Sequence, residues 1–248
     1  MKQVVFITGV TSGFGREFAR VFAKNGFLVV GTGRREERLR ELKDELKDSL
    51  EVIKLDVRNK KEVFEAVQSL PDRCRNIDIL INNAGLALGL ECANEASLDD
   101  WEVMIDTNIK GLLYVTKAIL PIMIERKSGY IFNIGSTAGN WPYEGGNVYG
   151  ATKAFVRQFS LNLRTDLKGT NVRVSNIEPG MAKTEFSNVR FKGDEEKASK
   201  VYNGYKPLLA EDIANLVFTL SKLPKHVNVN TLELMPICQS YGGLFVEK

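Results

Sequence analysis

The chain has 248 residues, of which 44% are hydrophobic and 26% are charged, and its formal net charge is +3. These values are typical of one globular domain and exclude a disordered chain, and the interleaved acidic and basic residues give no support to nucleic-acid binding. No stretch is long and apolar enough to span a membrane, and the first residues run into an apolar strand rather than a signal peptide, so we expect a cytoplasmic protein.

Short β-branched runs alternate with longer helical patterns along the chain, which predicts strand–helix–strand units around a parallel sheet. The predicted strands are residues 4–8, 28–32, 51–55, 77–82, 130–134, 172–177 and 230–234. The predicted helices are residues 14–24, 36–47, 60–69, 98–126, 148–167 and 210–221, the fourth being two helices broken near Gly111. We therefore predict a single α/β domain over residues 1–248, a doubly wound sheet of seven mostly parallel strands with helices on both faces.

A glycine-rich turn lies between the first predicted strand and the first predicted helix. Its glycines are Gly9, Gly13 and Gly15, and glycines at such a turn let the backbone approach a pyrophosphate whose charge meets the helix N-terminus. The sequence therefore predicts a dinucleotide site formed by Gly9, Thr11, Ser12, Gly13, Phe14 and Gly15. A purely conformational turn is the alternative. No lysine follows in the manner of a P-loop, which disfavours a nucleotide triphosphatase.

The end of the second predicted strand bears on the choice of coenzyme. An NAD-preferring site usually carries an acid there, which accepts hydrogen bonds from the ribose hydroxyls. This chain has Arg34 and Arg35 instead, and guanidinium groups hold a 2′-phosphate in a bidentate manner. We therefore expect NADP rather than NAD. The alternative is that both arginines only begin a charged, solvated helix.

Tyr149 and Lys153 are four residues apart in a predicted helix, so their side chains leave one face of it. A free tyrosine has a pKa near ~10, too high for a base at neutral pH. Opposite unit charges at about 4 Å interact by ~4 kcal/mol at an effective dielectric constant of 20, equivalent to roughly three pK units before desolvation opposes the shift. We therefore expect Lys153 to bring the pKa of Tyr149 toward neutrality, where it suits proton transfer with an alcohol or carbonyl.

Several motifs together carry a family resemblance. They are TGVTSGFG at the first strand, NNAG after the fourth, GSTAG after the fifth, YGATK in the helix that follows, and the Pro179-Gly180 turn. In these motifs the chain resembles the short-chain dehydrogenase/reductase family over essentially its full length. The resemblance implies a Rossmann-type fold and an enzyme that transfers a hydride between a nicotinamide coenzyme and a CH–OH group.

The resemblance also implies roles for individual residues. Tyr149 would be the catalytic acid/base, Lys153 would lower its pKa and bind the nicotinamide ribose, and Ser136 would hydrogen-bond the substrate oxygen. Asn108 would anchor a water that leads to Lys153, unless it merely caps a helix turn. Asp56 would contact the adenine. The remaining coenzyme residues would be Val57, Asn83, Ala84, Gly85, Pro179, Gly180 and Thr184.

Within the family, three runs are similar to the NADP-dependent 3-hydroxy acid dehydrogenases: NNAGLALG, GSTAG with WPY after it, and IEPG with Thr184-Glu185-Phe186-Ser187 after it. That similarity implies oxidation of serine, L-allo-threonine or 3-hydroxypropionate, or reduction of malonic semialdehyde. A carboxylate-bearing substrate needs a cation near the site. We expect residues 184–206, here called the lid, to cover the substrate, and Arg190 or Lys192 in it to supply that charge unless both are only solvated.

Two other functions remain open at this stage. One is a reductase of non-acidic carbonyls such as diketones, and the other is a non-catalytic NADP-binding sensor, which an intact tyrosine–lysine pair disfavours. A serine hydrolase built on Ser136 is disfavoured because Ile134 stands where a nucleophile elbow needs glycine and His226 is the only histidine. No metal site is expected, and Cys74, Cys92 and Cys238 are expected to be free thiols.

The apolar faces of residues 112–124 and 155–167 exceed what one sheet contact buries. Members of the family form tetramers through these helices, so we expect a homotetramer. The role of the C-terminal segment 241–248, including any contact with a neighbouring subunit, is left open.

Overall fold

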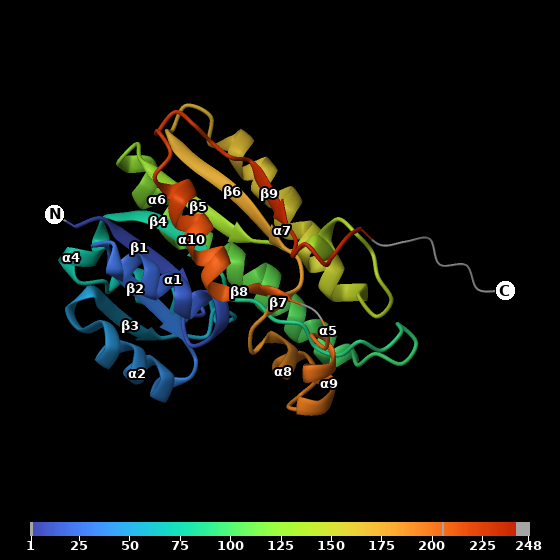
Figure 1. Ribbon diagram of the computed structural model, residues 1–248. Helices are drawn as coiled ribbons and strands as arrows, with labels where there is room; N and C mark the ends of the chain where they lie inside the picture. The colour runs from blue at the N-terminus through green and yellow to red at the C-terminus, as the bar shows by residue number, and fades with distance from the viewer. Residues whose placement is uncertain (1, 205, 242–248) are drawn as a thin grey trace.

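The computed structural model describes residues 2–204 and 206–241, and its centre is a seven-stranded parallel sheet (Figure 1). The strand order is β3-β2-β1-β4-β5-β6-β9, and every neighbouring pair is parallel. The strands are β1 (Val4–Thr8), β2 (Leu28–Gly33), β3 (Leu50–Lys54), β4 (Ile77–Asn82), β5 (Gly129–Ile134), β6 (Val172–Pro179) and β9 (Thr231–Leu234). The predicted fold class is confirmed.

The order of the strands reverses between β1 and β4. After β3 the chain crosses back over the sheet and adds β4 on the other side of β1. In sheets of this kind the connecting loops diverge at that point, and a crevice opens outside the carboxyl ends of the strands. The fold thereby brings the glycine turn after β1, the NNAG segment after β4 and the GSTAG segment after β5 to one edge.

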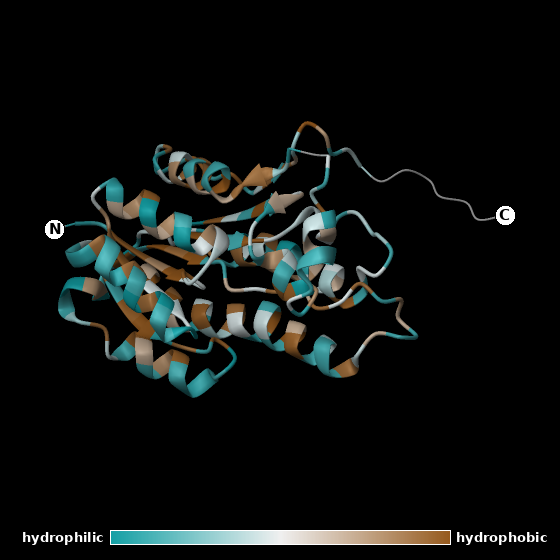
Figure 2. Ribbon diagram, turned by 60° about the horizontal axis from the view of Figure 1, so that its bottom comes forward, coloured by the Kyte–Doolittle hydropathy of each residue, from teal (hydrophilic) through white to brown (hydrophobic). Residues whose placement is uncertain are grey.

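The two faces of the sheet have separate apolar cores. Alternate residues of β1 show this, because Val5 and Ile7 belong to one cluster while Val4 and Phe6 belong to the other. Such a strand must be apolar throughout, since helices cover both of its faces. Figure 2 shows the hydrophobic strands between helices whose outward sides are hydrophilic.

One set of helices packs on the core that contains Val5 and Ile7, and a second set packs on the core that contains Val4 and Phe6. The first set is α1 (Gly13–Lys24), α2 (Glu36–Leu46) and α10 (Ala210–Ser221), and the second is α3 (Lys60–Gln68), α6 (Leu112–Glu125) and α7 (Asn147–Asp166). Helices α1 and α10 lie side by side across their face of the sheet (Figure 1). Shorter helices are α4 (Asp72–Arg75), α5 (Leu98–Ile105), η1 (Lys47–Ser49) and η3 (Thr137–Gly139).

The predicted break near Gly111 is wrong. Helix α5 continues through a π-helical segment, η2 (Asp106–Gly111), into α6, and Gly111 itself has helical angles of φ −57° and ψ −46°. The glycine serves packing, because a Cβ there would lie 2.6 Å from Cγ2 of Val57. A glycine needed for close approach and a glycine that ends a helix look alike in a sequence.

The lid has more regular structure than the sequence suggested. It contains α8 (Phe186–Arg190) and α9 (Glu195–Lys200), and a short parallel pair, β7 (Ala182–Lys183) with β8 (Leu208–Leu209), joins its two ends. Tyr202 strengthens the lid, since its hydroxyl bonds Ser187 at 2.7 Å and the carbonyl of Ala182 at 3.0 Å. Of the C-terminal segment whose role was left open, residues 242–248 lie outside the described residues.

Candidate active site

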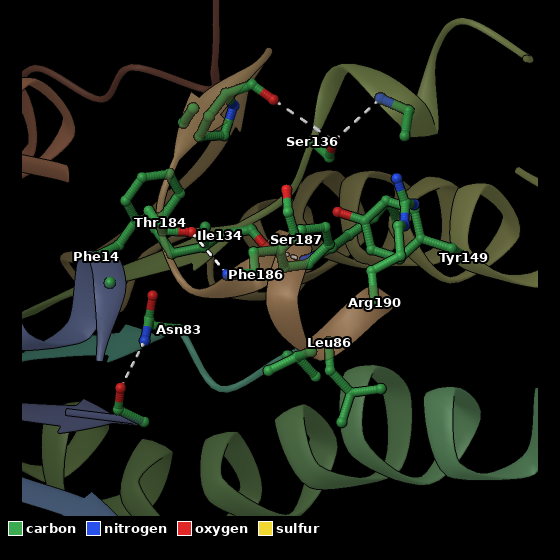
Figure 3. A pocket seen from close by; sticks show the side chains of 18 of the residues that line it. Phe14, Asn83, Leu86, Ile134, Ser136, Tyr149, Thr184, Phe186, Ser187 and Arg190 are labelled. Carbon is green, nitrogen blue, oxygen red and sulfur yellow. Dashed lines mark hydrogen bonds between the residues drawn. The ribbon is translucent and has the colours of Figure 1, made fainter. Parts of the chain in front are cut away.

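A cavity of about 620 Å³ lies at the carboxyl edge of the sheet, between the glycine turn and the lid (Figure 3). Of the predicted coenzyme residues, only Gly15 is not in its lining. The others are Gly9, Thr11, Ser12, Gly13, Phe14, Arg34, Arg35, Asp56, Val57, Asn83, Ala84, Gly85, Tyr149, Lys153, Pro179, Gly180 and Thr184. With Gly135 after β5 and Met235 after β9 also in the lining, the structure gathers segments from the ends of all seven strands of the sheet around one space.

The glycines of the turn are required by space as well as by conformation. Gly9 has φ +75°, and a Cβ on it would lie 3.0 Å from Nδ2 of Asn83. A Cβ on Gly15 would clash with the carbonyl oxygen of Gly9, so this residue holds α1 close against the turn instead of lining the cavity. Such a cradle leaves room for a pyrophosphate at the start of α1, and these residues therefore fit a dinucleotide.

Thr8 ties the NNAG segment to the turn. Its hydroxyl oxygen accepts hydrogen bonds from the backbone N–H groups of Asn83 at 3.0 Å and Ala84 at 2.9 Å. The Asn83 side chain in turn donates to the carbonyl of Thr8 at 2.8 Å. Asn83 therefore fixes the wall of the cavity as well as lining it.

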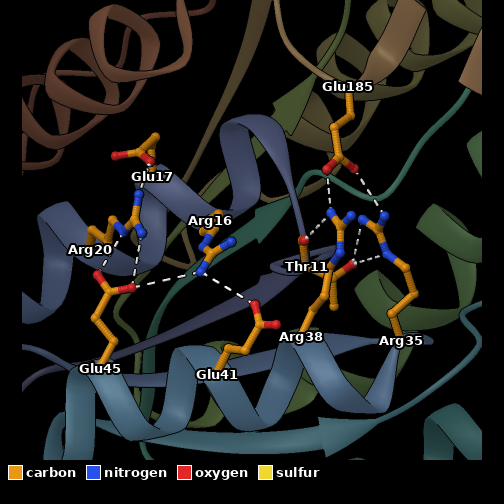
Figure 4. Close-up of polar contacts among 9 residues, drawn as sticks. All are labelled: Thr11, Arg16, Glu17, Arg20, Arg35, Arg38, Glu41, Glu45 and Glu185. Atoms are coloured by element: carbon orange, nitrogen blue, oxygen red, sulfur yellow. Dashed lines mark hydrogen bonds and ion pairs between the residues drawn. The ribbon is translucent and has the colours of Figure 1, made fainter. Parts of the chain in front are cut away.

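The two arginines after β2 lie beside the turn, as predicted, but one of them has an unexpected partner. Arg35 donates to Oγ1 of Thr11 at 3.1 Å and to Glu185 of the lid at 2.9 Å (Figure 4). Arg38 also pairs with Glu185. No acid stands at the end of β2 where an NAD site usually has one, but the fold brings Glu185 to Arg35 from 150 residues away.

Three of the four predicted catalytic residues, Tyr149, Lys153 and Ser136, line the same end of the cavity. Tyr149 and Lys153 are on α7 and only 8% and 7% exposed, and Ser136 follows β5. The ammonium of Lys153 donates to the carbonyl of Ile134 at 2.8 Å and lies 5.8 Å from the centre of the Tyr149 ring. The pair therefore shares a helix face without a direct hydrogen bond between its two ends.

Lys153 does not shift the pKa of Tyr149 as we expected. Burial raises the pKa of Tyr149 to about 12, although a hydrogen bond with Ser136 and the charge of Arg190 act to lower it. Burial lowers the pKa of Lys153 to about 8. The expectation of a phenol brought near neutrality by Lys153 is not met, because desolvation dominates and the lysine is turned to a backbone carbonyl.

Asn108 lies behind the cavity, in the π-helical segment η2. Its side-chain amide bonds both backbone groups of Leu86, at 2.9 Å and 2.8 Å, and donates to Oγ1 of Thr152 at 3.0 Å. These bonds join the loop after β4 to the helix that carries Lys153. The water that Asn108 was predicted to anchor stays a prediction.

The lid contributes one cation to the catalytic end. The guanidinium carbon of Arg190 lies 5.0 Å from the centre of the Tyr149 ring and 5.4 Å from that of Phe186, and Nη2 donates to the hydroxyl of Tyr143 at 2.6 Å. Its Nε is buried and has no hydrogen-bond partner among residues 2–204 and 206–241. Lys192, the other predicted cation, pairs with Asp100 at 2.7 Å and is not in the cavity lining.

Comparison with known proteins agrees with this arrangement. The family model described as short chain dehydrogenase matches residues 3–195. The chain belongs to that family. It is 62% identical to the NADP-dependent 3-hydroxy acid dehydrogenase YdfG of Escherichia coli strain K12 over 247 residues, which cover 99% of this chain and 100% of the relative. It is 51% identical to the serine 3-dehydrogenase of Rhizobium radiobacter over 246 residues, covering 99% and 98% of the two chains.

A solved structure resembles this dehydrogenase closely along its length. The closed form of a serine dehydrogenase in complex with NADP+ has a TM-score of 0.98 and 62% sequence identity, and the match covers 99% of this chain and 100% of that one. A crystal structure of serine dehydrogenase from Escherichia coli has a TM-score of 0.85 and 56% identity, with 96% and 100% covered.

Sequence reasoning missed Arg38 and Phe186 as parts of this dehydrogenase's site and gave Glu185 no part in coenzyme binding. Arg38 follows Arg35 by one turn of α2, which was a usable signal for a second guanidinium on the same face. Glu185 and Phe186 gave no such signal, because their partners Arg35 and Tyr149 are far away along the chain.

Neither a cluster of metal-binding side chains nor a membrane-spanning helix is found among the described residues. Within residues 2–204 and 206–241, no group of three or more histidine, cysteine, aspartate or glutamate side chains is placed to hold a metal ion. Across the same described parts of this dehydrogenase, none of the helices combines the length and apolar character needed to cross a membrane.

Proposed function

We propose that this dehydrogenase interconverts small 3-hydroxy acids and the corresponding 3-oxo acids with NADP(H), the coenzyme named for its relatives. Candidate substrates are serine, L-allo-threonine, 3-hydroxypropionate and malonic semialdehyde. One observation carries the proposal: the cavity that contains the glycine turn ends at Tyr149, Ser136 and the guanidinium of Arg190. A proton-transfer group and a carboxylate-binding group thus lie together beside a dinucleotide cradle.

NADP(H), when bound, supplies or accepts the hydride. The glycine turn with α1 would hold its pyrophosphate, and Arg34 with Arg35 would hold its 2′-phosphate. Asp56 suits the adenosine end, since its carboxylate lines the cavity and is kept in place by Arg58 at 3.0 Å. The hydrogen bonds from Arg58 also hold the pKa of Asp56 below its ordinary value, so it stays ionised.

Tyr149 moves the proton in this proposal. Because its pKa is raised to about 12, the phenol is protonated at neutral pH and is ready to donate to the oxygen of a 3-oxo acid as that oxygen becomes a hydroxyl. Ser136, which lines the cavity with Tyr149 and acts to lower the pKa of its phenol, would hold the same substrate oxygen. In the oxidative direction the phenolate form of Tyr149, which the nearby cation of Arg190 stabilises, accepts the proton of the substrate hydroxyl.

Arg190 would bind the substrate carboxylate. Its guanidinium is held against the rings of Tyr149 and Phe186, which fixes its plane, and its buried Nε has an unused N–H. An unpaired buried donor is costly, and an incoming carboxylate would satisfy it. A cation this close to Tyr149 favours acids whose hydroxyl is only a few bonds from the carboxylate.

The test is NADP+ reduction with serine, L-allo-threonine and 3-hydroxypropionate by the wild-type chain and by Tyr149→Phe. The variant lacks only the phenol oxygen, so we expect kcat to fall by at least about 10³-fold while NADP+ binding is kept. A wild type that binds NADP+ without oxidising any of these acids would refute the substrate class and favour the sensor. A fully active Tyr149→Phe variant would refute the role of the phenol.

A second candidate function also has a specific observation in its favour. Trp141, Tyr143 and Phe186 line the cavity, and such aromatic walls suit the reduction of less polar carbonyls such as diketones. The same preparation can be assayed with a diketone and NADPH. A kcat/KM for the diketone well above that for malonic semialdehyde would favour this candidate.

We also propose that the chain acts as a cytoplasmic homotetramer. Support comes from apolar side chains left partly exposed on α5 and α6, such as Ile105 and Ile124 at 36% and 39%, and from the stacked Phe155 and Phe159 on α7. The free thiols of Cys74, Cys92 and Cys238 suit a reducing compartment. Sedimentation equilibrium would test the assembly, and a mass of one or two chains would contradict it.

A further inference from the structure

Two clusters of acid and arginine residues join α2 to its neighbours, and they differ in position (Figure 4). In one, Glu45 pairs with Arg20 of α1 at 2.7 Å, on the outer surface. In the other, Glu185 of the lid pairs with Arg35 and Arg38. Only the second cluster borders the cavity, since Glu185 and Arg35 are in its lining and the residues of the first are not.

The donors of Arg35 are divided between two acceptors. Nε and Nη2 both point to Oγ1 of Thr11 in the glycine turn, at 3.2 Å and 3.1 Å, while Nη1 donates to the Glu185 carboxylate. Arg38 reaches the other oxygen of the same carboxylate from α2 and is not in the cavity lining. Glu185 is therefore bound by Arg38 on the side away from the cavity and by Arg35 at the cavity wall.

Glu185 is charged in this position. Partial burial acts to raise its pKa, but the hydrogen bonds from Arg38 and Arg35 outweigh this, and the pKa lies below its ordinary value. Guanidinium groups bind carboxylates and phosphates with the same planar, two-point geometry. A phosphate monoester carries a charge of about −1.5 to −2 at pH 7, so a 2′-phosphate at Arg35 would meet an existing anion.

We propose that Glu185 is an internal competitor for the coenzyme 2′-phosphate at Arg35 and so determines how strongly this dehydrogenase prefers NADP(H) to NAD(H). The inference rests on the proposed use of NADP. The 2′-phosphate takes over Arg35, while Arg38 keeps the carboxylate and with it the link between the lid and α2. Glu185 thus lowers the affinity for NADP(H) and leaves that for NAD(H) unchanged, because NAD(H) brings no phosphate to this wall.

The test is equilibrium binding of NADP+ and of NAD+, by isothermal titration calorimetry, to the wild type, Glu185→Gln and Glu45→Gln. Glutamine keeps the size of glutamate and one acceptor oxygen, but it removes the charge and replaces the other oxygen with an NH2 donor. Glu45→Gln is the matched control, since it removes the arginine-paired carboxylate of the other cluster, which lies on α2 away from the cavity. We expect Glu185→Gln to bind NADP+ about three- to tenfold tighter than wild type, NAD+ within about twofold, and the control to change neither.

Ionic strength gives a second measurement. Glu185, Arg35 and Arg38 are 36%, 43% and 36% exposed, so the charge effect is screened by salt. The increase in NADP+ affinity of Glu185→Gln over wild type should therefore become smaller as NaCl is raised from about 0.05 M to about 0.5 M. A gain that salt leaves untouched would contradict the proposal.

Three further outcomes would overturn the inference. They are an equal change in affinity for both coenzymes, no change for NADP+, or weaker NADP+ binding, because each means that Glu185 serves only to hold the lid. The binding contrast is measured without turnover. A chain that binds NADP+ with the expected contrast but oxidises no 3-hydroxy acid would refute the proposed reaction and not this inference.

Discussion

The coenzyme end of the cavity and its lid end are built in different ways. At the coenzyme end, backbone groups set the shape: Gly9 and Gly15 form the turn, and the Asn83 side chain closes it through hydrogen bonds to the backbone carbonyls of Thr8 and Gly9. At the lid end, side chains such as Glu185 and Arg190 contact partners far away in the chain. The first end depends on shape and the second on charge.

This difference has consequences for substitution. A backbone cradle tolerates no added atom, because a clash with a main-chain carbonyl cannot be relieved by a change of rotamer. A charged contact of the lid is partly exposed and independent of the core. Its loss should therefore change the binding of one ligand group without disturbing the packing of the core. The two ends should therefore respond to substitution with effects of different size and kind.

The largest effect is expected for Gly15→Ala at the coenzyme end. The new Cβ would clash with the carbonyl oxygen of Gly9, and α1 must then move away from the turn. We expect a loss of about 1 to 3 kcal/mol in the free energy of unfolding and a fall of at least about 100-fold in NADP+ affinity. Chemical denaturation and calorimetric titration measure the two quantities.

Gly26→Ala is a matched control for this variant. Gly26 has φ +84° and open space around its Cβ position, after the end of α1. Alanine there costs about 1 to 2 kcal/mol of backbone strain without touching the cavity, so NADP+ affinity should stay at the wild-type value. Similar losses of NADP+ affinity in Gly15→Ala and Gly26→Ala would mean that the affinity depends only on the overall stability of the fold. The contrast between the two ends would then disappear.

A smaller and more selective effect is expected for Arg190→Gln at the lid end. The variant loses the charge that would bind the substrate carboxylate, so KM for 3-hydroxy acids should rise about 10- to 100-fold while NADP+ affinity is unchanged. The pKa of Tyr149 should rise further, because the cation that lowers it is gone. The rise of oxidation activity with pH, which follows formation of the phenolate, should then move to higher pH.

Lys192→Gln is the control for Arg190→Gln, two residues away in the same lid. Its ammonium pairs with Asp100 and does not line the cavity, so its loss should leave KM within about twofold of wild type. Equal effects of the two substitutions would assign the loss to the lid as a whole. An unchanged KM in Arg190→Gln would exclude Arg190 as the carboxylate ligand.

The same division explains what the sequence could reveal. The strand and helix pattern, the family and NADP as coenzyme were predicted and are confirmed, because periodicity and the motifs around Gly9 and Tyr149 are local. The partner of Lys153 was not predictable, since four-residue spacing places it on the face of Tyr149 but does not reveal the carbonyl of Ile134. The acid at Arg35 comes from Glu185, and only the folded chain brings the two together.

Lys153 lies beside Tyr149 in the cavity wall, and its substitution should show what the burial of its charge costs. Its pKa falls from 10.5 to about 8, a cost on the order of 3 kcal/mol to the folded state, and its hydrogen bond to Ile134 offsets about 1 kcal/mol of that. Lys153→Met should therefore raise the free energy of unfolding by about 2 kcal/mol at pH 7, although we expect activity to be lost.

The pH dependence of this gain has a definite sign. The pKa of Lys153 is lower in the folded than in the unfolded chain, so its cost is complete below about pH 8 and disappears as the pH rises toward 10.5. Urea denaturation of both proteins at pH 7 and pH 10 measures it, and Tyr149 titrates alike in both. A gain of equal size at the two pH values, or a variant less stable than wild type at pH 7, would show that Lys153 carries no such cost and that its contact with Ile134 dominates.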